Sequence, residues 1–210
     1  ARIKNLFDLY CEPKAVYETL QVMNTLQPGL CVLGTRLPGC FNVFEMSVRA
    51  VLGQQITVKA ASTLAARLVA VYGTQVQTGI EGLTHSFPAP AAILALGENI
   101  SEHLGKLGII SARANTIYQL ARVLADEKND FGFCGNPEEE MQKLQAIRGI
   151  GSWTAQYIAM RAMGWPDAFL PTDAGIKKAL PDHTPKELQV LSEAWRPWRS
   201  YATVNLWNTL

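Results

Sequence analysis

The sequence predicts a mainly α-helical protein, and three features support that class. Apolar residues recur at intervals of three and four along most of the chain, whereas long alternations of β-branched residues are missing. Glycine and proline separate the periodic segments, which divides the chain into helices of ordinary length. Hydrophobic residues make up 48% of the 210 residues and charged residues 18%, which is enough apolar material for one sizeable core or two small ones.

The helical pattern is clearest over residues 44–72, which Gly73 ends. Within this segment the trio Gly53-Gln54-Gln55 interrupts the apolar spacing. Because a glycine inside a helix costs about 1 kcal/mol relative to alanine, the trio predicts a break between two helices.

The rest of the chain carries further helix signals separated by loops. Residues 84–90 are predicted to be a loop, and the acidic, irregular residues 126–137 are predicted to connect two subregions. Thr184 and Glu187, with a proline between them, predict a capping box at the start of a helix. Ser111 is a candidate N-cap. The remaining helices are predicted over residues 91–96, 100–104, 111–125, 138–147, 152–163, 174–180 and 198–210.

Composition excludes several classes of protein. The four cysteines form no C-x-x-C pair, so we expect neither a zinc site nor a disulfide framework, and a reducing cytoplasm fits best; they are Cys11, Cys31, Cys40 and Cys134. No apolar run reaches the roughly 20 residues that a membrane helix needs, and the N-terminus lacks the apolar segment of a secretory signal, so no membrane partner is expected.

Charge gives only a weak pointer to nucleic acid. The formal net charge is +1, whereas strong DNA binders usually carry a clear basic excess. Residues 141–210 hold eight basic and five acidic side chains, a balance of +3. A solvated helical surface explains that balance equally well.

The most specific signal is Gly149-Ile150-Gly151 at the start of a predicted helix. Two glycines two residues apart let the backbone turn tightly and expose successive N–H groups, and the helix start adds its positive end. With Ser152 and Thr154, these groups are predicted to bind a DNA phosphate. Ile150 can plug the groove between the two helices. The alternative is a helix–turn–helix corner in which the glycines serve only close packing.

Four stretches between residues 36 and 210 carry a family resemblance: RLPGCFNVFEMSVRAVLGQQIT, LQAIRGIGSWTAQYIAMR, FLPTD and WRPWRSYA. With them this part of the chain resembles the helix-hairpin-helix (HhH-GPD) superfamily of DNA glycosylases, in its 3-methyladenine DNA glycosylase II (AlkA) type. The resemblance implies two helical subdomains with an active-site cleft between them, preceded by a small α/β domain. Residues 1–35 are expected to be a remnant of that domain, with its strand and helix in residues 4–27. Residues 36–210 would then be the glycosylase domain, with the hairpin at 144–155.

This resemblance implies a monofunctional DNA glycosylase, which hydrolyses the N-glycosidic bond of alkylated bases such as 3-methyladenine in duplex DNA. The damaged base is flipped out of the helix first, and its removal is the first step of base excision repair. In such relatives the essential carboxylate follows the hairpin by about twenty residues, after a Leu-Pro pair, which corresponds to Asp173.

The chemistry gives Asp173 a clear role. Breaking the glycosidic bond develops positive charge on the sugar, and a carboxylate about 4 Å away would offset it by roughly 4 kcal/mol. That energy corresponds to about a thousandfold in rate. The alternative is that Asp173 only caps the helix that follows it, although one side chain can do both.

Aromatic residues are the candidates for receiving the flipped base. Trp153 and Tyr157 are four residues apart and share a helix face. By resemblance they line the pocket together with Trp207, where cation–π attraction of about 0.5 to 2 kcal/mol favours a cationic methylated purine. Ala174 stands where a tyrosine is common in the family, which implies a wider pocket. Ordinary core packing is the alternative for each aromatic residue.

The resemblance also concerns the DNA gap and the cofactors. Gln54 and Gln55 correspond to the wedge that fills the hole left by the flipped base, with Gln55 where the best-known pattern has leucine. The backbone carbonyls of Gln145, Ile147 and Gly149 correspond to ligands of a monovalent cation, Na⁺ or K⁺. No other cofactor, in particular no zinc and no iron–sulfur cluster, is expected, since no cysteine follows Cys134.

The reaction is expected to stop at hydrolysis. In bifunctional relatives a lysine just after the glycines forms a Schiff base with the sugar. Here that place reads Ser152-Trp153, so no AP-lyase activity is expected. The resemblance further implies that the partner is damaged double-stranded DNA, and we expect a monomer in a bacterial cytoplasm to bind it.

Two other functions stay open at this point. A non-catalytic helix-hairpin-helix module would bind phosphate with the same hairpin and use Asp173 only as a cap. A glycosylase for deaminated or mismatched bases would differ in pocket shape. A fusion to a methyl-accepting regulatory region, known in the wider family, is also left open.

Overall fold

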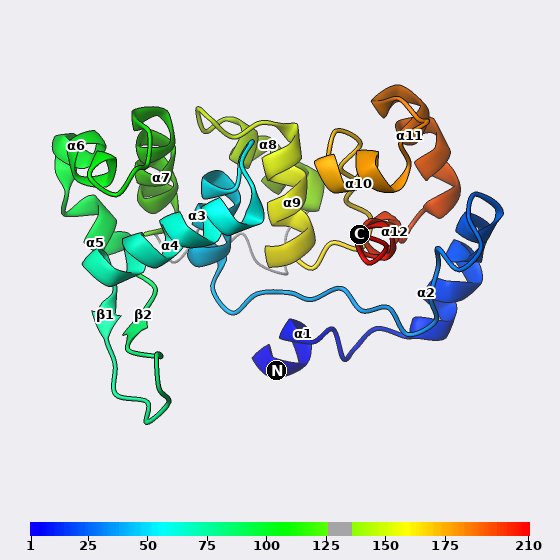
Figure 1. Cartoon of the computed structure of the whole chain (residues 1–210), viewed down its shortest axis with the longest axis horizontal. Helices are drawn as coiled ribbons and strands as arrows, with labels where there is room; N and C mark the ends of the chain where they lie inside the picture. Colours follow the sequence, from blue (N-terminus) through cyan, green and yellow to red (C-terminus); the bar gives the residue numbers. More distant parts are fainter. Residues whose placement is uncertain (126–135) are drawn as a thin grey trace. The chain divides into compact units, whose positions relative to one another are not determined.

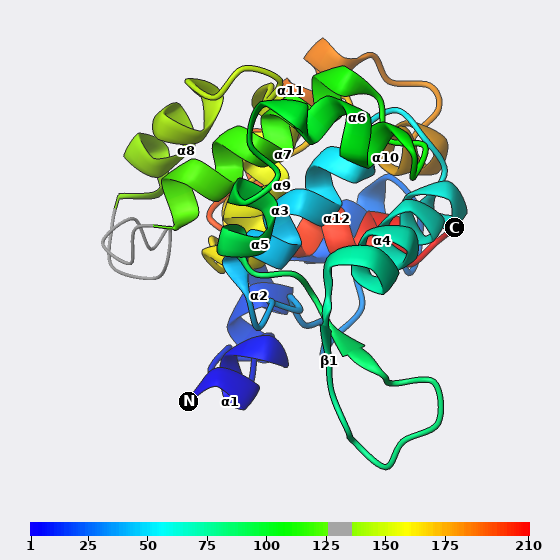
Figure 2. The ribbon, with the colours of Figure 1, turned by 90° about the vertical axis from the view of Figure 1, so that its left-hand side faces the viewer.

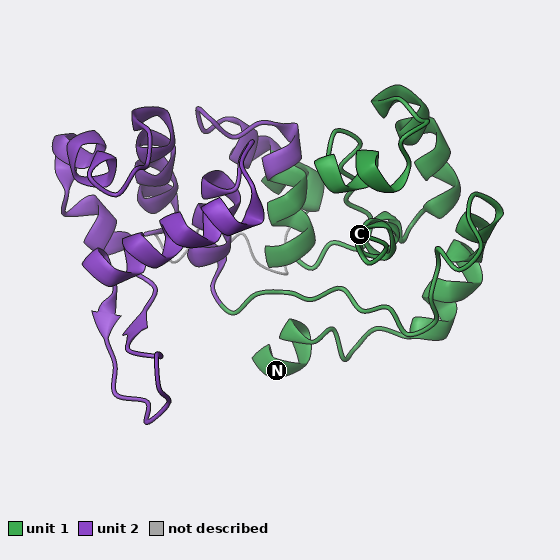
Figure 3. Ribbon diagram, viewed as in Figure 1, with its two compact units in different colours: residues 1–41, 133–141, 155–210 green, residues 42–132, 142–154 purple. Residues whose placement is uncertain are grey.

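The structure is a computed structural model that describes residues 1–125 and 136–210. Within these residues the chain folds into helices and a short two-stranded hairpin. It divides into two compact units (Figure 3): unit 1 comprises residues 1–41, 133–141 and 155–210, and unit 2 comprises residues 42–132 and 142–154. The predicted mainly α class with two helical subdomains is therefore confirmed. The cleft between the subdomains stays a prediction.

The C-terminal helix α12 organises unit 1. It packs against α10 and against the 3₁₀ helix η4, and Figure 1 shows it end-on beside α10. The elements that lie wholly in this unit are α1 (Arg2–Leu6), α2 (Pro13–Leu20), η1 (Gln21–Thr25), α10 (Ala174–Ala179), α11 (Pro185–Leu191), η4 (Ser192–Trp195) and α12 (Arg199–Trp207).

A buried ion pair fixes the start of α12. Arg199 is 6% exposed, and its guanidinium donates to both carboxylate oxygens of Asp167, at 2.7 and 2.9 Å, and to the Asp167 carbonyl at 2.9 Å. Arg196 binds the same carboxylate. Because hydrogen bonds to charged groups are among the strong ones, they hold α12, and with it Trp207, in a fixed position within unit 1.

The N-terminal segment differs from the sequence prediction. The strand expected within residues 4–27 is wrong, because helices occupy most of this stretch and Pro13 opens the second of them. A strand needs a partner for its backbone groups, and the described residues of unit 1 form none, so the segment satisfies these groups within helices.

The same segment is also part of a larger unit. The Asp8 carboxylate accepts hydrogen bonds from the Tyr201 hydroxyl and from the Leu37 amide, both at 2.9 Å. Asn205 accepts one from the amide of Val32 at 3.0 Å. Residues 1–41 therefore pack with the C-terminal helices in unit 1, and the assignment of residues 1–35 as a remnant of a larger N-terminal domain stays a prediction.

In unit 2, α7 contacts α3, α5 and α6. The break predicted at Gly53-Gln54-Gln55 is confirmed, since α3 ends just before it and α4 begins after Thr57, which caps α4. Asn42 caps α3 in the same way. The elements that lie wholly in this unit are α3 (Val43–Leu52), α4 (Val58–Tyr72), β1 (Thr74–Gln75), β2 (His85–Ser86), α5 (Pro90–Leu94), η2 (Gly97–Asn99), α6 (Ile100–Gly105) and α7 (Ser111–Leu124).

Two details of unit 2 correct the sequence prediction. The loop expected over residues 84–90 contains the short strand β2, which pairs antiparallel with β1 in a hairpin that extends from the end of α4 (Figure 2). Two-residue strands are too short to leave an alternating pattern in the sequence. Ser111 is the first residue of α7 and not its N-cap, because Ile110 takes the cap position with an extended backbone.

Two of the points where the chain passes between the units, at residues 141–142 and 154–155, lie inside helices. These are α8 (Pro137–Gln145) and α9 (Ser152–Ala162), close to the predicted 138–147 and 152–163. Of the predicted connection at 126–137, residues 126–135, Cys134 among them, lie outside the described part of the chain. No helix in the described part is long and apolar enough to cross a membrane.

Candidate active site and DNA-contacting hairpin

The predicted hairpin forms in unit 2, between α8 and α9. Gly149 has a φ of +95°, a conformation that favours glycine, and this explains why it is needed. Ile150 is 5% exposed, as a plug between the two helices would require, and its amide donates to the Ile147 carbonyl at 3.0 Å. Gly151 and Ser152 are exposed at the start of α9, and a Cβ on Gly151 would meet nothing within 4 Å. The hairpin thus presents a bare backbone at a helix N-terminus, the arrangement that binds phosphate.

A second reason for glycine at position 149 comes from α7. The Thr116 hydroxyl lies 3.0 Å from the Arg148 carbonyl, and a Cβ on Gly149 would collide with that hydroxyl. Thr116 is 3% exposed, so this contact is buried and fixes the hairpin to α7. Sequence reasoning missed it, because nothing in the local pattern around Thr116 links α7 to a turn that lies 32 residues away.

Gln54 and Gln55, predicted together as the wedge, differ sharply in the structure. The Gln54 side-chain nitrogen donates to the Gly149 carbonyl and to the Thr154 hydroxyl, both at 2.9 Å. Gln55 is exposed and has a φ of +54°. Of the pair, only Gln55 has its side chain exposed, so the wedge stays a prediction for Gln55.

Thr154 also differs from its predicted place on the phosphate-binding surface. It is 3% exposed, and its hydroxyl accepts the hydrogen bond from Gln54. Its side chain braces the hairpin from inside, which leaves Gly149, Gly151 and Ser152 as the exposed part of the predicted phosphate site.

The candidate catalytic carboxylate lies in unit 1, where Asp173 is the N-cap of α10. One oxygen, Oδ1, accepts hydrogen bonds from the amides of Gly175 and Ile176, at 2.8 and 3.1 Å, and from the Trp207 indole nitrogen at 2.8 Å. Asp173 is 9% exposed. The capping role is therefore confirmed, and the bond from Trp207 adds a contact that capping does not require.

Two of the three predicted pocket aromatics meet beside this carboxylate. The rings of Tyr157 and Trp207 are 6.3 Å apart and inclined by 50°, which is an ordinary aromatic contact. The predicted Asp173, Tyr157 and Trp207 are thus brought together within unit 1. Trp153, half-buried on the first turn of α9, belongs to unit 2.

Arg161 completes this group and was missed from the sequence. Its guanidinium lies 5.5 Å from the centre of the Trp207 ring and 5.9 Å from that of Tyr157. It also donates to the Pro38 carbonyl at 2.9 Å. The signal that could have revealed it is its spacing, four residues after Tyr157 on the same helix. A fixed positive charge therefore lies against the aromatic pair.

Gly175 is the second residue that the sequence did not reveal. A Cβ there would lie 2.7 Å from Cδ1 and 2.9 Å from Nε1 of Trp207, and 3.0 Å from Oδ1 of Asp173. Distances this short displace one of the partners, so glycine permits the indole to reach the carboxylate over the first turn of α10.

Two of the three carbonyls predicted to bind a cation already accept hydrogen bonds. The Gly149 carbonyl accepts from Gln54, and the Ile147 carbonyl accepts from Ile150. Since each carbonyl oxygen has two lone pairs, both can still coordinate a cation together with the Gln145 carbonyl. Neutral oxygens of this kind suit a hard cation. Among the described residues, no group of three or more histidine, cysteine, aspartate or glutamate side chains is placed to hold a metal ion.

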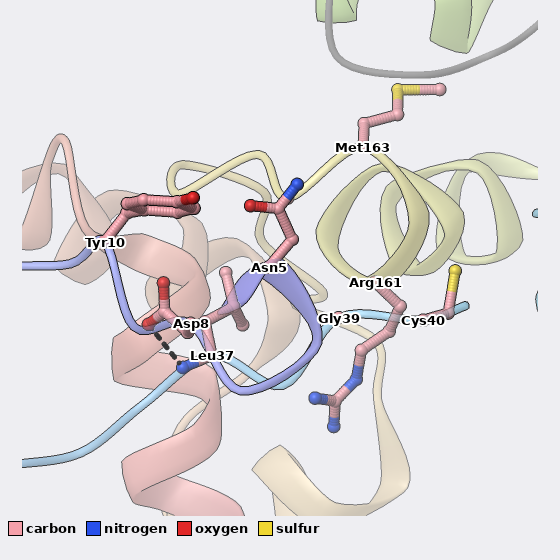
Figure 4. A pocket seen from close by; sticks show the side chains of 9 residues that line it. Asn5, Asp8, Tyr10, Leu37, Gly39, Cys40, Arg161 and Met163 are labelled. Carbon is pink, nitrogen blue, oxygen red and sulfur yellow. Dashed lines mark hydrogen bonds between the residues drawn. The ribbon is translucent and has the colours of Figure 1, made fainter. Parts of the chain in front are cut away.

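A small pocket lies elsewhere in unit 1 and shares only Arg161 with the group around Asp173 (Figure 4). Its volume is about 140 Å³. The Asp8 carboxylate at its wall is already bound to the Leu37 amide, the dashed line in Figure 4, and to Tyr201. Burial raises the pKa of the Tyr201 hydroxyl far above its usual value, so this contact is a structural bond between neutral phenol and carboxylate.

Comparison with known proteins agrees with this geometry. The profile of the HhH-GPD superfamily, described as base excision DNA repair proteins, matches residues 48–199. The chain is 37% identical to DNA-3-methyladenine glycosylase 2 of Escherichia coli, over its whole length and 71% of that protein. It is 40% identical to a protein of Mycobacterium tuberculosis named a probable bifunctional transcriptional activator/DNA repair enzyme AlkA, of which it spans 42%.

A solved structure shares the fold. The 3-methyladenine DNA glycosylase of Archaeoglobus fulgidus superposes with a TM-score of 0.78 at 22% identity, covering 98% of this chain and 72% of that one. Sequence and fold agree, and the profile spans well over half of the residues. The chain belongs to the HhH-GPD superfamily of base excision DNA repair proteins.

Proposed function

We propose that this chain is a monofunctional DNA glycosylase that hydrolyses the N-glycosidic bond of alkylated purines, 3-methyladenine among them, in duplex DNA. The observation that carries the proposal is the Asp173 carboxylate, whose Oδ1 is held by two backbone amides and the Trp207 indole. A carboxylate oriented in this way needs no rearrangement to act on charge that develops in the reaction.

The reaction follows from that orientation. The glycosidic bond breaks with its electron pair leaving on the base, while positive charge builds up on the sugar ring. The Asp173 carboxylate stabilises this charge, and the oxygen of a water molecule then bonds to the sugar carbon and releases a proton. An N-alkylated purine already carries a positive charge and leaves as a neutral base, which lowers the barrier for this class of substrate.

Tyr157 and Trp207 are proposed to receive the flipped base, and the part of Trp153 in the pocket stays a prediction from the resemblance. Cation–π attraction to these rings favours a cationic base, but Arg161 already lies against two of them. The Arg161 charge opposes a second cation nearby, so the aromatic group discriminates only modestly. Selectivity then comes mainly from the weakened bond of the damaged nucleotide, and the substrate range is broad.

The hairpin is proposed to hold the DNA. Exposed amides at Gly151 and Ser152 would bind a backbone phosphate, and Gln55 would fill the gap left by the base. The carbonyls of Gln145, Ile147 and Gly149 would hold a monovalent cation, which supplies positive charge next to that phosphate. We further propose that the protein acts as a monomer in a bacterial cytoplasm, where the chromosome lies.

Hydrolysis is proposed to be the whole reaction. Ser152 and Trp153 follow the hairpin glycines, so no amine stands at the place where bifunctional relatives form a Schiff base. Borohydride treatment during turnover should therefore trap no covalent protein–DNA adduct.

The decisive experiment compares the unaltered chain with Asp173→Asn on alkylated duplex DNA. Asparagine is also a good N-cap and can accept the same hydrogen bonds, so α10 should stay intact. The rate of methylpurine release should fall about a thousandfold, the loss expected for about 4 kcal/mol of charge stabilisation. Duplex affinity and thermal stability should change little.

The alternative, a non-catalytic DNA-binding module, takes its support from the same residue, because Asp173 does cap α10. It predicts tight duplex binding and no base release by either variant. Equal release by both variants would contradict the role of the carboxylate, and release of deaminated but not methylated bases would shift the substrate class.

A further inference from the structure

Gln54 connects two parts of unit 2 that are far apart in sequence. It lies in the break between α3 and α4, yet its side chain reaches the hairpin 95 residues further on. A side-chain amide has two N–H protons, and here its nitrogen meets two acceptors, the Gly149 carbonyl and the Thr154 hydroxyl, each at 2.9 Å. The donors and acceptors of this contact therefore match one for one.

The backbone carbonyl of Gln54 also accepts a hydrogen bond from another element. Arg113, on α7, donates through its guanidinium to the Gln54 carbonyl. The same helix braces the hairpin through Thr116, whose hydroxyl contacts the Arg148 carbonyl. The loop and the hairpin are thus fixed to each other directly through Gln54, and both are fixed to α7.

The residue that follows is strained and exposed. Gln55 has a φ of +54°, a region that few residues other than glycine adopt and that costs of order 1–3 kcal/mol. Such a conformation persists only where neighbouring contacts enforce it. The bonds of Gln54 on one side and the cap of α4 by Thr57 on the other supply those contacts.

We propose that Gln54 is a positioning residue that couples the phosphate-binding hairpin to the loop presenting Gln55. A phosphate bound at Gly151 orders the hairpin, and the two bonds from Gln54 transmit that order to residues 53–57. The side chain of Gln55 is thereby held toward the duplex near the phosphate that the hairpin binds. This inference rests on the proposed function, because it assumes that the hairpin binds phosphate and that Gln55 enters the DNA.

The test compares Gln54→Met with Gln55→Met. Methionine keeps the length of glutamine and removes its hydrogen bonds, so the two variants make the same chemical change at neighbouring positions. Hydrogen exchange of the amides of residues 53–57 is measured in the free protein and with an undamaged duplex, and methylpurine release is measured alongside.

In the unaltered chain and in Gln55→Met, the duplex should slow exchange at residues 53–57. In Gln54→Met, exchange in the free protein should rise about tenfold, the scale of losing one or two hydrogen bonds, and the duplex should no longer slow it. Methylpurine release should fall about tenfold in Gln54→Met, and adding Gln55→Met should cost little more, because coupled residues are not additive.

Equal exchange of residues 53–57 in both variants, or costs in base release that simply add, would overturn the coupling. If Gln54→Met does not fold, Thr154→Val removes one of the two acceptors and should raise the same exchange by a smaller factor. The exchange measurement involves no bond cleavage, so an inactive chain would contradict the proposed function and leave the coupling to be decided by exchange alone.

Discussion

The two units hold their candidate functional groups by different kinds of contact. In unit 1 the Asp173 carboxylate is placed by two backbone amides and by an indole. That indole lies against a guanidinium and next to a glycine that leaves it room. In unit 2 the hairpin is placed by glycine geometry and by side chains that bind backbone carbonyls, those of Gln54 and Thr116. Stabilising a charged transition state depends on the identity of side chains, whereas binding a phosphate depends on exposed amides.

The difference extends to the charges of the two units. Unit 1 buries the Arg199–Asp167 pair, whereas the Lys106–Glu102 pair of unit 2 is exposed to solvent. A buried charge that loses its partner is costly, and an exposed one is not. Breaking an ion pair should therefore destabilise the protein more in unit 1 than in unit 2.

The largest effect is expected from Arg199→Met. It leaves Asp167, whose side chain is 10% exposed, with Arg196 as its remaining cationic partner. The free energy of unfolding should fall by up to about 3–5 kcal/mol, the loss for a buried charge without a partner, reduced by what Arg196 still offsets; urea denaturation measures it. The matched change in unit 2 is Lys106→Met, which breaks a fully exposed pair and should leave the free energy of unfolding nearly unchanged. Equal losses in the two variants would remove this contrast between the units.

The next effect is expected from Gly175→Ala. Alanine is normally about 1 kcal/mol better than glycine in a helix, yet its Cβ would lie 2.7 Å from the Trp207 ring. The indole must then leave Asp173, and methylpurine release should fall at least about tenfold while the unfolding free energy changes by less than about 1 kcal/mol. A change in tryptophan fluorescence would report the movement. Unaltered release would show that the Trp207 contact does not matter.

The matching glycine of unit 2 should behave in the opposite way. Gly151 has open space around its Cβ position and no left-handed backbone, so Gly151→Ala should fold as before. The added methyl group would instead stand where a phosphate approaches the amides. Duplex affinity should fall several-fold, up to about tenfold, with little change in the rate at saturating DNA. Fluorescence anisotropy measures the affinity, and an unchanged value would contradict phosphate binding at the hairpin.

The sequence predicted the helices well because their signals are local. The break after α3 shows in Gly53, and the start of α11 shows in the capping box of Thr184 and Glu187, which the structure confirms. The hairpin was also predictable, because the left-handed backbone at position 149 favours glycine and the sequence shows that glycine directly. The expected N-terminal strand failed for the opposite reason, since a strand depends on a partner that local sequence cannot supply.

The candidate site was predicted only in part. Motif resemblance identified Asp173, Tyr157 and Trp207, and the structure brings these three together. The resemblance could not identify Gly175, which matters because it has no side chain to displace Trp207, a residue 32 positions further along the chain. Nor could it separate Gln54 from Gln55, because two identical neighbours differ here only in backbone conformation and in what they reach.

The smallest effect concerns the way each unit caps a helix. In unit 1 the backbone amide and hydroxyl of Thr184 lower the pKa of Glu187 below its ordinary 4.5. A carboxyl whose pKa is lowered on folding stabilises the protein above pH 4.5, and that contribution is lost as the pH falls through the folded pKa. Glu187→Gln keeps the capping box without titrating, so its thermal midpoint should fall slightly less than that of the unaltered chain between pH 6 and pH 3. In unit 2, Asn42 caps α3 with a neutral amide. Asn42→Ala should therefore lower the free energy of unfolding by about 1 kcal/mol, and by the same amount at pH 6 and at pH 3. The two caps would not differ in this way if the loss in Asn42→Ala depended on pH, or if Glu187→Gln and the unaltered chain had the same pH dependence of the thermal midpoint.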